Sequence, residues 1–218
     1  MTLPPKLAGE SKSFLGAVLS VFVFVPLFAF QRLGGFDFWW WMSLCVAAMV
    51  SLAFTLDKSY FRLILEDLKQ GLGKKIGLGL FSAVFLYAVF FIGNEAARTI
   101  FPFAGENISQ VYSFKEQAPV LRIIISMLLL IGPGEELFWR GYLQRIWMRR
   151  FGNVVGSLLA ACLYALVHAA SGNIMLVLAA GVCGFFWGFL YLRYRSFVLI
   201  CTSHTLWDLM VFVIWPLH

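Results

Sequence analysis

Long apolar runs separated by short polar stretches dominate the chain. A helix that crosses a bilayer needs about 20 mostly apolar residues. By this measure the runs predict seven spanning helices, at 14–31, 37–56, 76–95, 119–140, 154–171, 174–192 and 197–215. The predicted fold class is therefore an all-α, polytopic membrane helix bundle. The first run is expected to be a retained span, because no small-x-small cleavage site follows it.

The stretches between the runs differ in pattern. Residues 57–75, DKSYFRLILEDLKQGLGKK, alternate charged and apolar positions at helical spacing, which predicts a short amphipathic helix on the membrane surface. Residues 96–118 form the longest polar stretch and are predicted to be a loop. No internal repeat or separate soluble domain is apparent, so we expect residues 1–218 to form a single membrane domain.

The composition agrees with a membrane protein. Of the residues, 61% are hydrophobic and only 13% are charged, which is too little polar surface to cover a soluble domain of 218 residues. The net charge is +6, but lysine and arginine are scattered between the apolar runs and form no dense block. We therefore expect contact with membrane lipids and no binding of nucleic acid.

The positive charges predict an orientation. Five lysines and arginines lie in 57–75, three more follow the fourth run at Arg145, Arg149 and Arg150, and Arg193 and Arg195 follow the sixth. With seven spans, these three stretches fall on one side of the membrane. The positive-inside rule then places the N-terminus in the cytoplasm and the C-terminus outside. The small, minimal architecture suggests a bacterial inner membrane.

Six ionisable residues in the last four predicted spans are candidates for a site. A charged side chain at the bilayer centre costs at least about 3 kcal/mol, and such residues usually face the bundle interior and serve a function. The six residues are Glu135, Glu136, Arg140, His168, His204 and Asp208.

The spacing of these residues separates the two adjacent glutamates. Glu136 and Arg140 are four residues apart, so they can pair on one face of a helix and support the site. Glu135 points about 100° away from Glu136 on the same helix. We therefore expect Glu135 to have no counter-charge from its own helix.

Two further pairs are also separated by one helical turn. Tyr164 lies four residues before His168, and His204 lies four residues before Asp208, which could orient the imidazole ring. For these helices to meet Glu135 at one depth, the helix of the fourth span must continue past Arg140 to Arg149 and Arg150.

Two other features of the site follow from the sequence. Pro133 interrupts the backbone hydrogen bonds just before the glutamates and is expected to kink the helix and admit water. Tyr164, Trp139 and Trp207 are expected to line the resulting pocket.

This set of groups is suited to peptide hydrolysis. An unpaired carboxylate can activate water as a general base, and imidazoles can hold the water or stabilise an oxyanion. Glu135, His168 and His204 would also suit zinc, so a zinc site stays open as an alternative although no cofactor is assigned. A second alternative is a proton-coupled transporter or a non-enzymatic membrane immunity or partner protein, because buried carboxylates and histidines also relay protons.

Three ordered motifs give the chain a resemblance to a known family. Glu-Glu-x-x-x-Arg at 135–140, aromatic-x-x-x-His at 164–168 and His-x-x-x-Asp at 204–208 resemble the CPBP family of CAAX-prenyl endopeptidases and bacteriocin-processing (Abi) proteases. The similarity covers residues 119–215, the expected catalytic core. It implies an intramembrane endopeptidase, glutamic-type or metallo, that acts on membrane-anchored, lipidated or precursor proteins.

The resemblance also implies roles for single residues. Glu135 would activate water with help from His168, and His204 with Asp208 would stabilise the oxyanion. The chain departs from the family pattern at Tyr164, where phenylalanine is common, and at Asp208, where the prenyl-protein members have asparagine. Because an ionised aspartate repels an oxyanion, Asp208 is either protonated or orients His204.

Overall fold

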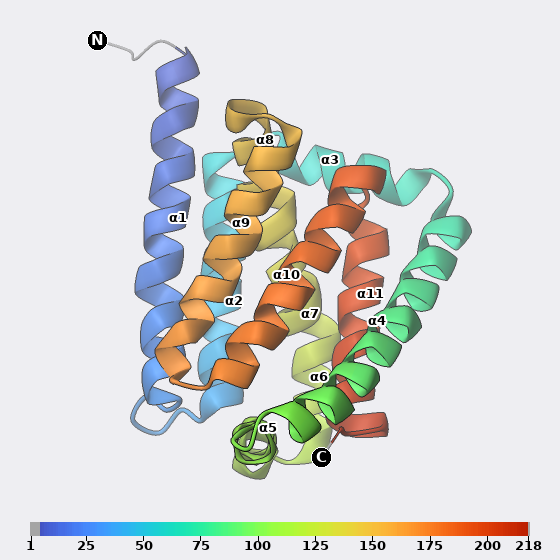
Figure 1. Ribbon diagram of the computed structural model, residues 1–218. Helices are drawn as coiled ribbons and strands as arrows, with labels where there is room; N and C mark the ends of the chain where they lie inside the picture. The colour runs from blue at the N-terminus through green and yellow to red at the C-terminus, as the bar shows by residue number, and fades with distance from the viewer. Residues whose placement is uncertain (1–4, 218) are drawn as a thin grey trace.

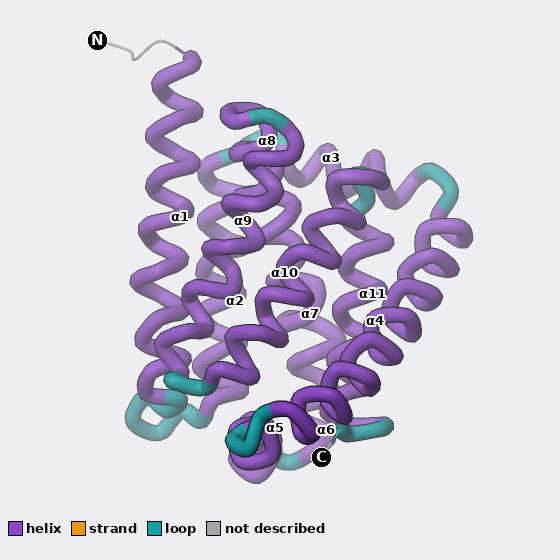
Figure 2. Tube along the Cα trace, viewed as in Figure 1, coloured by secondary structure: helices purple, strands orange, loops and turns teal. Residues whose placement is uncertain are grey.

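The computed structural model describes residues 5–217, with side chains from Phe14 onward. Helices form nearly all of this part of the chain, which confirms the all-α class (Figures 1 and 2). The α-helices are α1 (Pro5–Phe30), α2 (Phe38–Leu56), α3 (Tyr60–Lys69), α4 (Leu72–Ile100), α5 (Ala104–Tyr112), α6 (Val120–Ser126), α7 (Gly132–Glu136), α8 (Arg145–Phe151), α9 (Asn153–His168), α10 (Ile174–Tyr194) and α11 (Phe197–Leu209).

The long helices are those of a multi-pass membrane protein. Five helical stretches are long and apolar enough to cross a bilayer: α2, α4, α9 with its following turn, α10, and α11 with the π-helical turn Met210–Ile214. In α1 the apolar part is Phe14–Phe30, which is shorter. The remaining predicted span lies in the continuous helical run 120–151, so each predicted run lies in a helical stretch to within a residue at its ends.

The predicted surface helix is present as α3. It lies across one end of the bundle, at the top of Figure 1, and Tyr60 is its buried residue. The helix is shorter than 57–75 because Gly71, with φ +60°, turns the chain into α4 before Lys74. Tyr60 donates a hydrogen bond from its hydroxyl to the carbonyl oxygen of Leu137, which anchors α3 to the helical run 120–151.

The predicted loop at 96–118 was wrong. Most of this segment is helical: α4 continues to Ile100, α5 follows, and a 3-10 helix covers Ser113–Gln117. Its aromatic residues anchor it to the bundle: Phe114 stacks on Phe38 with ring centroids 4.5 Å apart, and the Tyr112 hydroxyl donates to the carbonyl of Val211. These tertiary contacts stabilise helices that the local polar sequence did not predict.

The helical run 120–151 carries the glutamates and is continuous past Arg140, as predicted. Two π-helical stretches, Met127–Ile131 and Leu137–Gln144, connect α6, α7 and α8. The first stretch directly precedes α7, where Pro133 has no backbone N–H to donate. A wider π turn is a common way for a helix to accommodate such a break.

Arg145, at the start of α8, corrects one part of the charge analysis. It was expected among the residues that set the orientation, but it is buried, with an ion pair of 2.6 Å to Asp57 and a hydrogen bond of 2.6 Å to the carbonyl of Gly141. Arg149 and Arg150 are exposed at the same end. Arg145 therefore connects α8 to the end of α2 through its ion pair with Asp57.

Candidate active site

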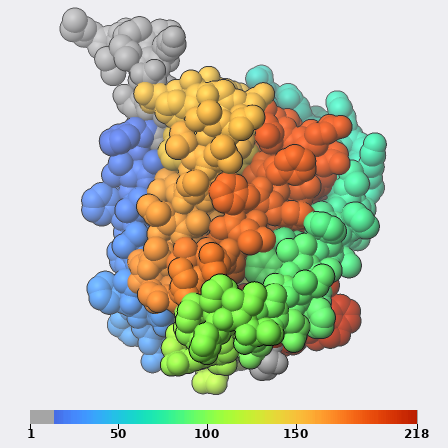
Figure 3. Space-filling model, viewed as in Figure 1, coloured from blue at the N-terminus to red at the C-terminus, as the bar shows by residue number. Residues whose placement is uncertain are grey.

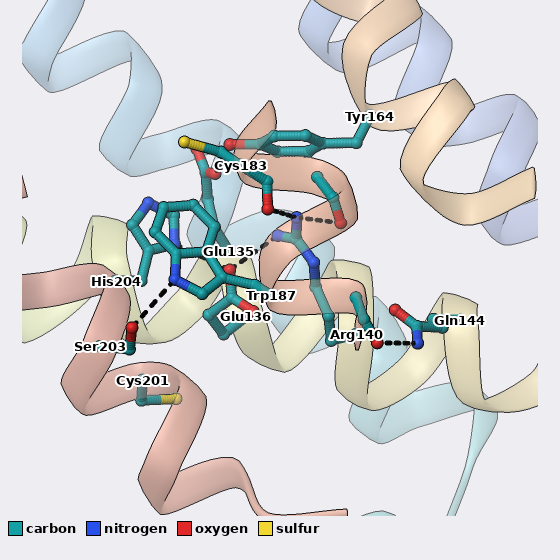
Figure 4. A network of polar contacts seen from close by, with 12 residues as sticks. Glu135, Glu136, Arg140, Gln144, Tyr164, Cys183, Trp187, Cys201, Ser203 and His204 are labelled. Atoms are coloured by element: carbon teal, nitrogen blue, oxygen red, sulfur yellow. Dashed lines mark hydrogen bonds and ion pairs between the residues drawn. The ribbon is translucent and has the colours of Figure 1, made fainter. Parts of the chain in front are cut away.

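A buried ionic cluster lies at the centre of the bundle (Figure 4). Glu136 is fully buried, and its Oε1 accepts hydrogen bonds from the Arg140 guanidinium at 2.7 Å and from Nδ1 of His204 at 2.8 Å. The contact between Glu136 and Arg140 is the one predicted from their spacing. The contact with His204 comes from α11, and helical spacing could not predict it.

Aromatic rings and carbonyl groups surround the Arg140 guanidinium. It lies over the ring of Tyr164, 4.5 Å from the centroid, and 5.5 Å from the ring centroid of Trp187. It also donates to the carbonyls of Cys183 and Gly184, both at 3.4 Å. Arg140 thus has compensating partners on several sides, as a buried cation requires.

Glu135 faces a different environment from that of its neighbour. Its carboxylate Oε2 accepts a hydrogen bond of 2.8 Å from the hydroxyl of Tyr164, on α9. The side chain is almost completely buried, yet it lines a cavity. Among the described residues, the ion pairs of this cluster all involve Glu136 or Asp208 and none involves Glu135.

His168 is held in a defined orientation one turn after Tyr164. Its Nδ1 lies 2.7 Å from the carbonyl oxygen of Tyr164, and its ring packs 4.1 Å from the ring of Phe28 on α1. Because a carbonyl oxygen only accepts, Nδ1 carries the proton in the neutral ring and Nε2 keeps its lone pair. Tyr164 therefore positions both Glu135, through its hydroxyl, and His168, through its backbone.

His204 lies between two carboxylates. Its Nδ1 contacts Glu136, and its Nε2 is 3.5 Å from Oδ1 of Asp208, the residue expected to orient it. The imidazole stacks on Trp187 with centroids 3.7 Å apart and an interplanar angle of 19°. The Trp187 indole N–H in turn donates to Ser203 Oγ at 3.1 Å. The orientation of His204 is thus fixed on three sides.

These groups border one cavity of about 530 Å³ with a largely apolar lining. Of the residues predicted for the site or pocket, its lining includes Glu135, Tyr164, His168, His204, Trp207 and Asp208. Glu136 and Arg140 are not part of the lining and lie behind it. Trp139 does not line the cavity either, because its ring packs against Phe24, Phe138 and Tyr164. The expectation for Trp139 is therefore corrected.

A protein zinc site needs at least three converging histidine, cysteine or carboxylate ligands. Among the side chains described, from Phe14 to Leu217, no three histidine, cysteine or carboxylate groups converge as metal ligands. Glu136 and Asp208 flank the two ring nitrogens of His204. The set Glu135, His168 and His204 does not fit zinc in this arrangement.

The sequence did not predict two residues of this site. Trp187 and Ser203 support His204, but a tryptophan and a serine in an apolar helix more often reflect packing than a site. The sequence contained one indication of the role of Ser203, which is its position directly before His204, a predicted site residue.

The comparison with family models bears on this cluster. Residues 117–210 match the model described as type II CAAX prenyl endopeptidase Rce1-like. This part of the chain is therefore similar to the Rce1-like family. The Rce1-like region covers a little under half of the chain and contains all three motifs, which confirms the predicted resemblance. No curated protein and no solved structure matches the chain.

Proposed function

We propose that the protein is an intramembrane endopeptidase that hydrolyses a peptide bond with water activated by Glu135. The family match supports a membrane protease. The observation that carries the proposal is that Glu135, which has no ion pair, and His168 both line one largely apolar cavity, with Tyr164 in contact with each of them.

In the proposed reaction, the Glu135 carboxylate takes a proton from a water molecule that also donates to Nε2 of His168. The resulting hydroxide attacks the carbonyl carbon of the peptide bond, and the carbonyl oxygen becomes an oxyanion. Glu135 then gives the proton to the leaving nitrogen as the C–N bond breaks. The Tyr164 hydroxyl holds one oxygen of Glu135, which directs the other oxygen toward the water.

His204 would stabilise the oxyanion through Nε2, the nitrogen next to Asp208. In this proposal Asp208 contacts His204 and does not contact the substrate. Supporting this, Asp208 Oδ1 lies on the Nε2 side of the ring, at 3.5 Å. Asp208 is then a positioning residue.

The proposed substrate is a membrane-anchored, lipidated or precursor protein, in agreement with the family. For the location we propose a bacterial inner membrane, with the N-terminus in the cytoplasm. The positive charges at 57–75 and at Arg149 and Arg150 support this orientation. The cavity, lined in part by α5 at the opposite end of the bundle, then lies in the outer half.

The test is cleavage of a lipidated peptide by the purified protein in proteoliposomes. Glu135→Ala is expected to abolish cleavage while the helical circular dichroism spectrum is unchanged. Glu116→Ala serves as the control, because this glutamate is exposed and lies outside the cavity lining. Cleavage by Glu135→Ala at the wild-type rate would contradict the proposal.

A further inference from the structure

One hydrogen-bond donor at the cavity wall has no partner. Trp207 lines the cavity from α11 and is only 8% exposed, and its indole nitrogen Nε1 is buried with no acceptor among the described residues. Buried donors in folded proteins are nearly always paired. The partner of this N–H is therefore to be sought in a molecule that occupies the cavity.

The other tryptophans of the lining show that an unpaired indole is unusual for this site. Trp39 donates its indole N–H to the carbonyl of Phe114 at 2.8 Å, and Trp187 donates its own to Oγ of Ser203 at 3.1 Å. All three rings border one cavity, but Trp207 alone has an indole donor that the described part of the chain leaves unused. Packing around this cavity is thus compatible with paired indole groups, and the exception needs its own explanation.

Two aromatic rings hold the indole of Trp207 in place. Phe90 of α4 packs against it edge to face with centroids 4.7 Å apart, and Trp187 of α10 does so at 5.6 Å. A ring face accepts a hydrogen bond only weakly. Neither ring therefore replaces an oxygen acceptor for the N–H.

The position of Trp207 relates it to the proposed chemistry. Trp207 lies three residues after His204, so both side chains project from the same side of α11. Asp208, the next residue, and Glu135 line the same cavity. A ligand that meets the indole N–H therefore lies beside the groups proposed to act on the peptide bond.

The lining restricts the chemistry of this ligand. The carboxylates of Glu135 and Asp208 would repel an anion. Helices α4, α5 and α10, which come together on the face shown in Figure 3, add mostly apolar side chains. A neutral carbonyl oxygen inside such a lining needs a donor. In a polypeptide, the neutral acceptor that every residue carries is its backbone carbonyl.

We propose that the indole N–H of Trp207 donates a hydrogen bond to a backbone carbonyl oxygen of the substrate and so positions the peptide beside Glu135 and His204. The side chain of Phe90, which is partly buried, turns aside as the peptide enters. This inference rests on the proposed function, because it assumes that the ligand is a peptide. It adds Trp207 to the residues that contact the substrate.

A matched pair of replacements removes an N–H with little change of shape. Benzothienylalanine, in which sulfur takes the place of the indole N–H, is incorporated at position 207 or, as the control, at position 39. The change at Trp207 removes no hydrogen bond of the free protein and should leave the unfolding temperature unchanged. The change at Trp39 deprives the Phe114 carbonyl of its donor and should lower the unfolding temperature. Trp207→Phe is the second test if the unnatural residue is poorly incorporated.

The measurement is binding of a fluorescent peptide that carries a hexadecyl thioether on its cysteine. Each replacement is made in Glu135→Ala protein in proteoliposomes, so that the peptide is not hydrolysed. Loss of one hydrogen bond is expected to raise Kd about 3–10-fold for the change at position 207, and the change at position 39 should not raise it. An unchanged Kd at position 207, an equal rise at both positions, or no binding of the peptide to any variant would overturn the proposal.

A second series of peptides identifies the acceptor. Each amide in turn carries sulfur in place of oxygen, which weakens that carbonyl as an acceptor. At one amide, the sulfur should weaken binding to protein with Trp207 but not to protein that lacks the N–H, because both changes remove the same hydrogen bond. Sulfur effects that are equal in the two proteins at every amide would contradict a direct contact.

This experiment separates the contact from the proposed function, because binding requires no hydrolysis. Weaker binding after the change at position 207, together with no cleavage by the unmodified protein, would contradict the protease and leave the contact standing. Cleavage by the unmodified protein with a Kd that is independent of the indole N–H would contradict the contact alone.

Discussion

Glu135 and Glu136 are neighbours in the sequence, but they lie in regions of opposite character. Glu136 belongs to a closed ionic cluster in which Arg140 and His204 contact the same carboxylate oxygen. Glu135 lines the cavity, where the hydroxyl of Tyr164 donates to it. One carboxylate is therefore compensated by a cation, and the other has no ion pair; in the proposed function the second exchanges a proton with water.

Apart from changes at Glu135, the largest effect on activity is expected from His168→Gln. The substitution removes the lone pair of Nε2, and loss of a group that assists proton transfer typically lowers a rate by about 10²–10⁴-fold. The thermal unfolding temperature should change little. The measurement is peptide cleavage in proteoliposomes alongside thermal unfolding in detergent. A rate close to that of the unmodified protein would show that the water is held elsewhere.

The largest effect on stability is expected from Arg140→Met. It leaves Glu136 buried without its guanidinium partner, and breaking a buried ion pair from one side costs about 3–5 kcal/mol. The double variant Arg140→Met, Glu136→Gln should recover much of this loss, because no uncompensated charge remains. Arg149→Met, at an exposed position of α8, is the control and should be neutral. Denaturant unfolding measures all three. An equally stable Arg140→Met protein would argue against the ionic cluster.

A smaller, pH-dependent effect is expected at Asp57, outside the membrane. Burial raises the pKa of this carboxyl, but hydrogen bonds from Ser59 and the ion pair with Arg145 outweigh burial and hold the pKa below its usual range. A lowered folded-state pKa adds stability above the unfolded value of about 3.9, which is lost as pH falls through the folded value. The unfolding temperature should therefore decrease when the pH is lowered below about 4. In Asp57→Asn this part of the pH dependence should be absent. An identical pH profile for the two proteins would contradict the assignment.

The smallest effect is expected from Tyr164→Phe. It removes the hydrogen bond to Glu135, which is worth about 0.5–1.5 kcal/mol, and keeps the ring beneath Arg140. Cleavage should therefore slow by up to about tenfold. Kinetic constants measured with the same peptide test this prediction, and complete loss of activity would place Tyr164 in the reaction itself.

Much of the fold was predictable because the bilayer restricts what an apolar run can form. The runs at 37–56, 174–192 and 197–215 lie within a residue or two of the helices observed. The polar segment 96–118 was not predicted as helical, because contacts such as that between Phe114 and Phe38 are formed between distant parts of the chain. Local pattern does not contain this information.

The candidate site shows the same limit. Contacts within one helix, such as Glu136 with Arg140, follow from the four-residue spacing alone. The contact of His204 with Glu136 and the stacking of Trp187 on His204 depend on how three helices are rotated against each other. The spacing of residues predicts which of them share a face of one helix. Only the packing of the helices determines which residues of a neighbouring helix this face contacts.

The most direct test of the division between the two glutamates compares Glu135→Gln with Glu136→Gln. Each purified variant is assayed for peptide cleavage in proteoliposomes and for thermal unfolding in detergent. We predict that Glu135→Gln unfolds like the unmodified protein but does not cleave, whereas Glu136→Gln unfolds at a clearly lower temperature. Cleavage by Glu135→Gln, or a stability loss at position 135 as large as that at position 136, would contradict the account.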